Sequence, residues 1–543
     1  MPSAAMSASP GRATFPVTTA ARSWECPCAS EARSALRLRH PRGRPTDKAR
    51  PPERLALVWS PMETGFWYIW PFLLALIQFG GMAGAAIHVM LTKTDERAAA
   101  GWIGFIVLVP FAGWMIYLIL GINRIERRAR ELRGQKHDML LLAPLPVRAG
   151  SRPAEGVVKL RELEGLARFS QKILPESFVQ GNTVVLLLNG DETYPAMIEA
   201  INKAERSIAI STYIFNNDSV GRRFVEALSR AMDRGVRVRL LLDGVGSWYS
   251  RPSLIPLLNK CGIDYARFLH SFMPWQMPYL NMRNHQKIFV VDGTHGFTGG
   301  MNIAEGNVLE ENPGKPVKDC HFRIEGPVVA HLMHTFAYEW NFTTGELLEG
   351  PAWFPEIASS GDIVARGLPA GPDMGLNPIR WTLLGALAEA RHNVRIVTPY
   401  FLPDATLRTN ISLAAMRGVI VDIVLPETNN LPFCDWAATP QLAWLARAGC
   451  RIWKTKGPFE HTKMMTVDGM WAMVGSANWD ERSLRLNFEF NLECYGATFA
   501  GELDALIERK ISAAHLLTYE ELSGHSTPIR IRNALFRLAT PYL

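Results

Sequence analysis

Cysteine is scarce in this chain of 543 residues, and its seven cysteines are odd in number. They are scattered, mostly through apolar or strand-like stretches, so they do not form the disulfide framework of a small secreted protein. We therefore expect reduced thiols in a cytosolic compartment. Cys26 and Cys28, with His40, supply too few well-placed ligands for a zinc site.

Positive charge is in only modest excess, with a formal net charge of +7. The basic residues are concentrated in the first sixty residues and in a second cluster, which consists of Arg124, Arg127, Arg128, Arg130 and Arg133. Basic clusters beside an apolar segment indicate anionic lipid as the neighbouring partner. We expect no nucleic-acid partner, and no protein partner is evident from the sequence.

Regular periodicity is missing from residues 1–61, which mix Pro, Ser, Ala and Arg. This composition predicts a basic, disordered N-terminal extension. An Arg-rich leader is also typical of a transit peptide. We favour an upstream start codon instead, because Met62 begins a far more structured sequence.

Formal charge is absent from two long stretches, residues 66–91 and 102–122. Each is long enough to cross a hydrocarbon core of about 30 Å. Buried helices of a soluble core are the alternative, but such helices usually have a polar face. Residues 62–125 are therefore predicted to form a transmembrane hairpin. Basic residues before the first span and after the second place both ends, and the chain downstream, in the cytoplasm.

Residues 126–180 are predicted to be a basic juxtamembrane segment and linker, and the chain from Gly181 onward is predicted to be α/β. Strands are predicted at 184–188, 207–215, 236–242, 394–401 and 419–425, and helices at 196–204, 220–232, 383–390 and 405–416. This alternation, repeated once, predicts two pseudo-twofold-related domains, 181–365 and 366–543. Each should contain a mainly parallel sheet covered on both faces. The junction should lie in the Gly- and Pro-rich segment 350–378.

A polar motif repeats across the two halves. His285, Lys287 and Asp292 recur 176 positions later as His461, Lys463 and Asp468. Asn302 recurs at the same offset as Asn478, behind Gly-Gly in the first copy and Gly-Ser in the second. Two such strings in register are not a chance match, and solvated surface strands would not need them. They indicate a duplicated catalytic half-site.

The repeated residues suit a phosphodiester. On a strand, positions i and i+2 face the same side, so His285 and Lys287 should project together, as should His461 and Lys463. The two lysines, with Asn302 and Asn478, can donate to non-bridging oxygens. One neutral imidazole can then attack phosphorus while the opposite imidazolium protonates the leaving oxygen. The ammonium groups supply the positive charge, so we expect no metal and no cofactor.

Four acidic residues accompany the repeated motif. Each histidine needs a partner on its second ring nitrogen, and Asp319 and Glu489 are our candidates for this orienting role. Both follow their motif and precede a glycine by seven positions. Asp292 and Asp468 belong to the catalytic motif, but each closes an apolar strand just before a glycine. We expect them to hold a turn or a lysine.

Both copies resemble the signature of the phospholipase D superfamily, H-x-K-x4-D-x6-G-[GS]-x-N. The resemblance implies two-step transfer through a phosphohistidine, with His285 as the nucleophile and His461 as the general acid and base. Further matches are the paired spans with their Arg-rich tail, the segment Thr398 to Asp404, the segment Asn478 to Glu489 and the C-terminal Leu535 to Leu543. Through these matches the chain is similar to the bacterial cardiolipin synthases. The family often has Pro where Glu481 stands.

The resemblance implies that two phosphatidylglycerol molecules are joined into cardiolipin and glycerol. It also implies a multi-pass protein of the bacterial inner membrane whose partners are phosphatidylglycerol and membrane lipids. A further group of apolar and aromatic residues has two equally good explanations, packing in the core or an apolar lip that contacts acyl chains. Its members are Met273, Trp275, Met277, Pro278, Tyr279, Phe433 and Trp436. Other readings are a phospholipase, a phosphatidylserine synthase, a nuclease, and a membrane-tethered lipid-binding protein with dead sites.

Overall fold

The computed structural model describes residues 61–93, 95–121, 163–174, 177–270, 282–311, 314–374 and 376–540. The predicted N-terminal extension, the arginine cluster at 124–133 and the apolar residues at 273–279 lie outside these ranges. The chain divides into two compact units, Met1–Ala83 and Gly84–Leu543.

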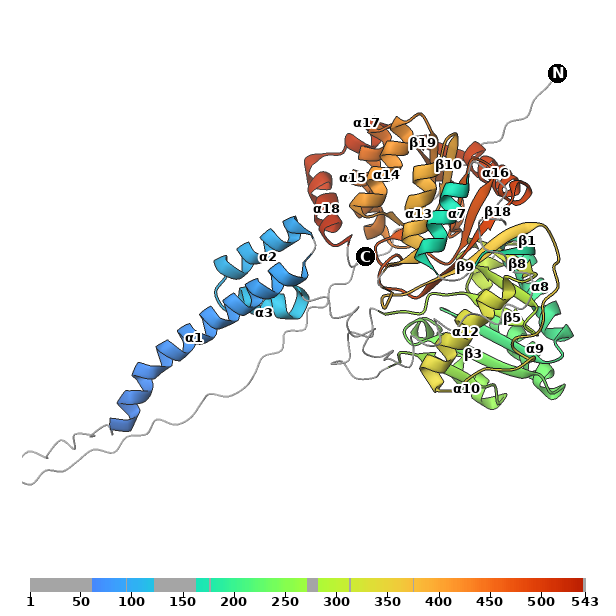
Figure 1. Ribbon diagram of the computed structural model, residues 1–543, viewed down its shortest axis with the longest axis horizontal. Helices are drawn as coiled ribbons and strands as arrows, with labels where there is room; N and C mark the ends of the chain where they lie inside the picture. Colours follow the sequence, from blue (N-terminus) through green and yellow to red (C-terminus); the bar gives the residue numbers. More distant parts are fainter. Residues whose placement is uncertain are drawn as a thin grey trace, which may run out of the picture. The chain divides into compact units, whose positions relative to one another are not determined.

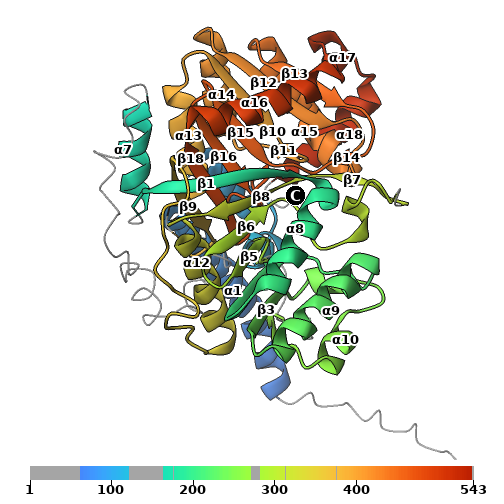
Figure 2. The same ribbon diagram turned by 90° about the vertical axis from the view of Figure 1, so that its right-hand side faces the viewer.

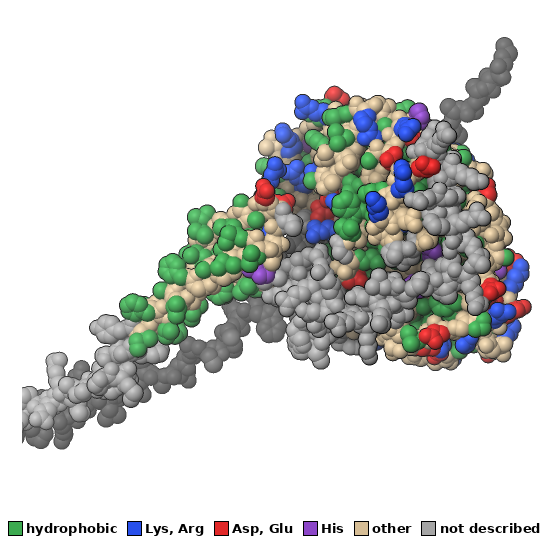
Figure 3. Space-filling view, viewed as in Figure 1, with side chains coloured by type: hydrophobic (Ala, Val, Ile, Leu, Met, Phe, Trp, Pro, Cys, Tyr) green, Lys and Arg blue, Asp and Glu red, His purple; other side chains and the backbone are tan. Residues whose placement is uncertain are grey.

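Helix α1 (Pro61–Thr92) contains the first predicted span. Its segment Ile69–Thr92 has a mean hydropathy of 1.7, and in the described part of the chain it alone is long and apolar enough to cross a membrane. Apolar side chains cover the visible face of this helix (Figure 3), and its exposed apolar residues fall at successive positions around it; Phe72 and Leu91 are 77% and 80% exposed. A helix that is apolar on every side, yet not buried in protein, is typical of a membrane span.

The second predicted span is not one continuous helix. It is divided into α2 (Glu96–Leu108), α3 (Ala112–Ile116) and a short π-helix (Tyr117–Gly121). Pro110 lies in the break, and a proline has no N–H to donate to a helix. The predicted hairpin of two uninterrupted spans is therefore not confirmed.

The rest of the described chain is built on one sheet of fifteen strands that runs through both halves (Figure 1). Its first-half strands are β1 (Val179–Leu188), β2 (Ser207–Thr212), β3 (Arg237–Asp243), β4 (Tyr265–Phe268), β5 (Ile288–Val291), β6 (His295–Gly299) and β8 (Cys320–Glu325). Its second-half strands are β9 (Ile363–Ala370), β10 (Asn393–Val397), β12 (Ile420–Pro426), β13 (Arg451–Thr455), β15 (Met464–Val467), β16 (Trp471–Gly475), β18 (Glu489–Tyr495) and β19 (Ala514–Leu517). The spatial order is β19-β13-β12-β10-β15-β16-β18-β9-β1-β8-β6-β5-β2-β3-β4. The halves therefore meet where β1 pairs with β9, and Figure 2 shows β1 running between them.

The α/β class is confirmed, but the prediction of mainly parallel sheets is wrong. Within the described sheet, only β2–β3, β3–β4, β10–β12 and β12–β13 are parallel neighbours. The hairpins β5–β6 and β15–β16 are antiparallel, and so are the pairings of β8 and β18. Strand–helix–strand crossovers build only the outer part of each half. After each H-x-K segment, a tight turn and not a helix joins β5 to β6 or β15 to β16. The two strands of each pair must therefore run antiparallel.

Helices cover both faces of this sheet. They are α7 (Glu164–Ile173), α8 (Asn189–Lys203), α9 (Ser219–Asp233), α10 (Ile255–Lys260), α12 (Val329–Thr344), α13 (Pro378–Glu389), α14 (Ala405–Met416), α15 (Pro432–Arg447), α16 (Ala497–Ser512), α17 (Tyr519–Ser523) and α18 (Thr527–Leu538). Strand β2 shows the alternation, because Ile208 and Ile210 pack in the cluster of α8 and α9, whereas Ala209 packs in the cluster of α12. The predicted positions of the regular elements are confirmed to within a few residues, except that helix α8 begins seven residues earlier, and β1 and α13 each begin five residues earlier.

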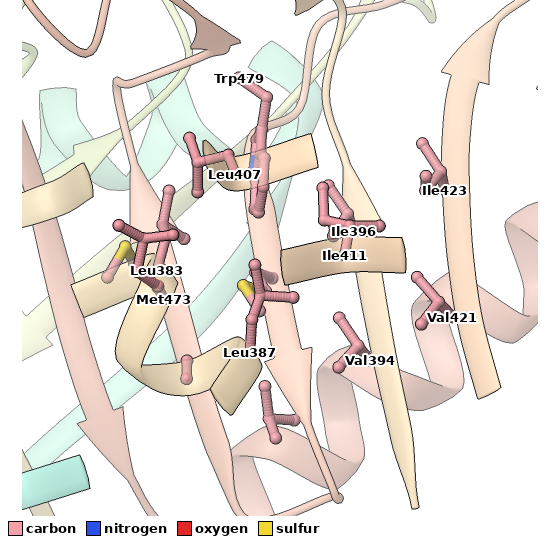
Figure 4. Packing of buried hydrophobic residues seen from close by; sticks show 14 of the residues in the cluster. Leu383, Leu387, Val394, Ile396, Leu407, Ile411, Val421, Ile423, Met473 and Trp479 are labelled. Atoms are coloured by element: carbon pink, nitrogen blue, oxygen red, sulfur yellow. The ribbon is translucent and has the colours of Figure 1, made fainter. Parts of the chain in front are cut away.

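Among the described residues, three buried clusters form the core. One lies beneath α13, α14 and α15 of the second half, where Leu383, Leu407 and Ile411 pack on Ile396 and Ile423 (Figure 4). The matching cluster of the first half lies beneath α8 and α9. The third lies on the opposite face and includes residues of both α12 and α16, so it belongs to both halves. Hydrophobic burial therefore holds the halves together as one body.

Part of the predicted linker is core of the second half. Leu166 of α7 is fully buried in the cluster of α13. Arg366 of β9, also fully buried, donates to the carbonyl of Ser170 at 3.0 Å and to Glu493 at 2.8 Å. The domain boundary predicted at 365/366 falls inside β9, which pairs with β18 of the second half. Composition did not reveal this, because α7 is short and lies far along the chain from its partners.

Candidate active site

The two H-x-K segments lie immediately before β5 and β15 rather than on them. Within each, the lysine folds back onto its own histidine: Lys287 Nζ donates to the carbonyl of His285 at 2.7 Å, and Lys463 Nζ donates to that of His461. The charge of Lys463 acts on His285, and that of Lys287 on His461. The fold thus brings all four groups into one site at the junction of the halves.

Each histidine is held by an acid from the opposite half. His285 Nδ1 lies 3.0 Å from Glu489 Oε2, and His461 Nδ1 lies 2.8 Å from Asp319 Oδ2. Both carboxylates are fully buried, whereas the imidazoles are 12% and 14% exposed. A partner on Nδ1 fixes the ring, so Nε2 is left for a substrate.

Backbone pairing between the halves produces this crossed arrangement. His285 N donates to the carbonyl of Phe488 at 2.9 Å, and Phe488 N donates to that of Arg283 at 2.8 Å. In the other half-site, β7 (Val317–Lys318) pairs with β14 (Phe459–Glu460), and His461 N donates to the carbonyl of Lys318 at 2.7 Å. Each histidine segment is therefore bonded to the residue just before the other half's acid.

Burial lowers the pKa of both imidazoles, because it disfavours the charged form. The pKa of His285 falls well below its usual 6.5 through burial, and then through the charges of Lys287, Lys463 and Arg283. Burial, followed by the charge of Lys463, lowers the pKa of His461 to about 4. In the free site both imidazoles are therefore neutral near pH 7.

The two acids differ in charge. Burial raises the pKa of Glu489 to about 7. Burial acts in the same direction on Asp319, but the charges of Lys463 and His461 outweigh it, so the pKa of Asp319 lies below its usual value. His461 therefore faces a fully ionised carboxylate, whereas Glu489 beside His285 is only partly ionised near neutral pH. This makes the two half-sites electrostatically unequal.

The second position of the Gly-[Gly/Ser]-x-Asn tail differs between the two copies. A side chain at Gly300 would meet the carboxylate of Asp319 at 2.5 Å. The corresponding residue of the second copy is Ser476, whose hydroxyl donates to Glu489 Oε2 at 2.5 Å, while Asn487 Nδ2 donates to Oε1 at 3.1 Å. The longer acid thus gains two neutral donors where the shorter acid has a glycine. Burial raises the pKa of Glu489 and outweighs these donors, which lower it.

The two asparagines differ as well. Asn302 is half-buried and its Oδ1 accepts the N–H of Ile214 at 3.2 Å, so its amide nitrogen is the group left to donate. Asn478 is buried and its Nδ2 donates to the hydroxyl of Ser483 at 3.3 Å. Asn302 therefore has its amide nitrogen left to donate to a phosphate, whereas the amide nitrogen of Asn478 already donates to Ser483.

Three neighbouring residues were missed from the sequence. The ring of Tyr213 contacts that of His285 edge-on at 5.0 Å, and its hydroxyl accepts from Arg283 at 2.7 Å. Burial and then the charge of Arg283 lower the pKa of Arg482, which places a second guanidinium nearby. Arg283 could have been found, since positions 283, 285 and 287 alternate onto one face. Tyr213 and Arg482 carry no such signal.

Asp292 and Asp468 occupy turns rather than the reacting centre. Asp292 has a φ of 51° and accepts the backbone N–H groups of Glu205, Arg206 and Ser207 at 2.7 to 3.0 Å. Asp468 has a φ of 53° and accepts the same three N–H groups of the corresponding loop, at residues 391–393. The motif aspartates thus join the loop before β2 or β10 to the end of β5 or β15.

We expect Asp292→Ala to lower the free energy of unfolding by about 2 kcal/mol, because three charge-assisted hydrogen bonds are lost and the left-handed backbone disfavours alanine. Asp292→Asn is the matched control, since it keeps one acceptor oxygen and tolerates that φ. Denaturant unfolding of the purified chain in detergent would measure both. Equal stability of Asp292→Ala and the unaltered chain would contradict this structural role.

The two described members of the proposed apolar lip pack within the second half. Phe433 packs against the core cluster, and the ring of Trp436 contacts that of Phe536 at 5.0 Å. Trp436 also lies beneath the guanidinium of Arg532, at 4.3 Å. Trp436 therefore joins α15 to α18.

Comparison with known families and proteins agrees with this geometry. The model of the family "Cardiolipin synthase, PLD-like domain" matches residues 197–340 and 383–511, which include both H-x-K segments. A second model, "Phospholipase D-nuclease N-terminal", matches residues 82–121. The crystal structure of a phosphatidylserine synthase from Haemophilus influenzae shares the fold, with a TM-score of 0.55 and 15% identity over 70% of this chain and 100% of that one.

Curated relatives extend the match to most of the chain. A protein of Pseudomonas fluorescens named cardiolipin synthase A is 30% identical over 88% of this chain and 99% of its own length. A cardiolipin synthase of Geobacillus kaustophilus is 28% identical over 84% of this chain and 91% of its own. The chain belongs to the cardiolipin synthase family of phospholipase D-type phosphatidyltransferases.

Proposed function

We propose that this enzyme joins two phosphatidylglycerol molecules into cardiolipin and glycerol through a phosphohistidine at His285. One observation carries the proposal: two partly buried imidazoles are each held by an acid of the opposite half, beside two lysines, in a chain of this family. This set provides an attacking nitrogen, a proton donor and positive charge for a phosphodiester.

In the first step, Nε2 of His285 attacks the phosphorus of one phosphatidylglycerol. The bond from phosphorus to the glycerol oxygen breaks, and that oxygen takes the proton of His461 Nε2, so glycerol leaves. In the second step, His461 removes the proton from a hydroxyl of a second phosphatidylglycerol. The oxygen attacks phosphorus, the nitrogen–phosphorus bond breaks and cardiolipin is released.

The inequality of the acids supports this assignment of roles. The nucleophile must be neutral, and the pKa of His285 lies far below 6.5. The general acid must carry a proton, and the ionised Asp319 beside His461 favours the imidazolium. A bound phosphodiester adds a negative charge between the rings, so it raises both histidine pKa values, and the charge of Asp319 raises that of His461 in addition.

Substrate binding also raises the pKa of the two lysines. Burial lowers the pKa of Lys287 to about 7 and that of Lys463 to about 8. An entering phosphodiester raises both values, so each ammonium is fully charged when it donates to a non-bridging oxygen. Asn302, with its carbonyl oxygen already fixed, adds a further donor.

The surrounding cations favour a lipid acceptor over water. Arg283 and Arg482 lie beside the site in addition to the lysines, and their charges repel each other. A second phosphatidylglycerol brings its own phosphate, which would relieve that repulsion. Water brings no charge, so it would not relieve this repulsion.

We place α1 across the bacterial inner membrane, with residues 102–122 as the second arm of a hairpin and both catalytic halves in the cytoplasm. The exposed apolar surface of α1 and the family match at residues 82–121 support this placement. The basic residues that flank the two apolar stretches support the orientation. An enzyme held in this way meets phosphodiesters of the membrane.

The test is to supply the purified full chain with phosphatidylglycerol in detergent micelles, with EDTA present, and to follow lipids and glycerol together. We expect cardiolipin and glycerol in equal amounts. Phosphatidic acid as the sole product would contradict the synthase, and phosphatidylserine formed from added serine in preference to cardiolipin would indicate the other acceptor. Loss of activity with EDTA would contradict a mechanism in which lysines alone neutralise the phosphate.

A further inference from the structure

Helix α18 has two opposite faces, and only one of them packs on the protein. Its inner face carries Asn533, which is buried, and Phe536, which contacts Trp436 of α15. Its outer face carries three large apolar side chains at helical spacing, Ile531, Leu535 and Leu538. These are 57%, 62% and 74% exposed. A surface helix usually turns polar residues outward, so this second apolar stripe needs a partner.

Arginines lie beyond the apolar stripe on both sides. At 100° per residue, Arg530 and Arg537 lie on one side and Arg532 on the other, each roughly 90° to 130° from the middle of the stripe. The guanidinium of Arg532 donates to Asn533 Oδ1 at 2.9 and 3.1 Å. No acidic residue occurs between Thr527 and Thr540. Figure 3 shows Lys and Arg side chains over the part of the second half that carries α14, α15 and α18. An apolar stripe flanked by cations is the pattern of a helix that lies in a membrane interface.

We propose that the outer face of α18 docks into the headgroup region of an anionic bilayer. Ile531, Leu535 and Leu538 would enter the acyl boundary while Arg530 and Arg537 contact lipid phosphates. A second copy of the chain fits less well, because pairing two such faces would bring their arginine rows together. The stability of α18 does not depend on this docking, since its inner face is held by Trp436, with Arg532 stacked on the same ring.

This docking rests on the proposed function only for the choice of phosphatidylglycerol as the lipid. The proposed span α1 ties the chain to the membrane but does not by itself orient the catalytic halves. A contact through α18 would hold the second half against the bilayer surface, so that lipid headgroups need not travel through water to the site. It should lower the interfacial KM without changing the chemical step.

Photo-crosslinking tests the contact directly. Leu535→p-benzoylphenylalanine is placed in the full chain, which is reconstituted into nanodiscs of phosphatidylglycerol and phosphatidylcholine and irradiated. We expect a protein adduct with the mass of one lipid. Leu347→p-benzoylphenylalanine is the control, because Leu347 is 55% exposed but lies between Glu346 and Glu349 and should give no lipid adduct. A crosslinked dimer, or a link to the chain's own residues 61–121, would overturn the proposal.

Kinetics supply the second test. Leu535→Asp should raise the interfacial KM for phosphatidylglycerol about tenfold, with kcat unchanged, since a charge replaces a buried leucine in the interface. Leu347→Asp should change neither value. An unchanged KM for Leu535→Asp would overturn the docking even if the enzyme makes cardiolipin. Failure of the proposed function would appear instead as the wrong product in every variant, with lipid crosslinking at position 535 intact.

Discussion

His285→Ala is expected to abolish phosphatidyl transfer, with a loss of about four orders of magnitude or more, because no other described group can take its place as the nucleophile. Its Nε2 is the nitrogen left free by the contact with Glu489, and its low pKa keeps it neutral. No protein-bound phosphatidyl group should form in this variant. The measurement is the yield of cardiolipin, together with mass spectrometry of the chain after a brief reaction and an alkaline quench, which preserves phosphohistidine.

His461→Ala is the matched control for this prediction. It should also lose turnover, but a substrate with a good leaving group, such as a 4-nitrophenyl phosphodiester, should still load His285. The intermediate should then accumulate, because no base remains to activate the acceptor. If His285→Ala accumulated the intermediate instead and His461→Ala never formed it, the assigned roles would be reversed.

Asp319→Asn is expected to lower kcat with phosphatidylglycerol on the order of 10³-fold, although Asp319 never touches the substrate. Its carboxylate lies 2.8 Å from Nδ1 of His461 and comes from the other half of the chain. Without that charge the pKa of His461 falls further, so less imidazolium is present to protonate glycerol. The pH above which kcat declines should therefore move to lower pH. With the 4-nitrophenyl phosphodiester the loss should be far smaller, because that leaving group needs no proton.

Glu489→Gln is the companion variant and should behave differently. The pKa of Glu489 is about 7, so near neutral pH much of this side chain is already uncharged, and its removal should cost less than that of Asp319. The loss should not depend on the leaving group, since His285 acts as the nucleophile for every substrate. If both variants lost activity equally and kept the same pH profile, the acids would act only by supporting the fold.

The sequence predicted the local elements well because their patterns are local. Alternation on β2 and β3 and the helical spacing of α9 and α14 are set by neighbouring residues, and their bounds agree closely with prediction. The direction of the strands was not predictable in this way. The turns after β5 and β15 each contain an aspartate in the left-handed conformation followed by a glycine, and these turns make the sheet largely antiparallel.

The second predicted span was not confirmed as one continuous helix, and part of the predicted linker is a helix in the core, for related reasons. Hydropathy counted the apolar residues of 102–122, but it gave no weight to the missing N–H of Pro110. Composition assigned α7 to a linker, although Leu166 and Ser170 complete the core of the second half. Their partners lie some two hundred residues away, where no local pattern points back to them.

By itself, the sequence determined that the chain is duplicated, that each copy carries one histidine and one lysine, and that phosphodiester chemistry fits them, because residue types and spacing fix these properties. Only the tertiary structure decided which acid serves which histidine. The segment of each histidine forms backbone hydrogen bonds with the residue that precedes the acid of the other half. These bonds place each carboxylate beside the histidine of the opposite half. Burial raises the pKa of both carboxyl groups, but the charges of Lys463 and His461 outweigh it at Asp319, so Asp319 is charged while Glu489 is only partly ionised near neutral pH. Two nearly identical motifs become unequal because a pKa depends on surroundings that only the folded chain creates.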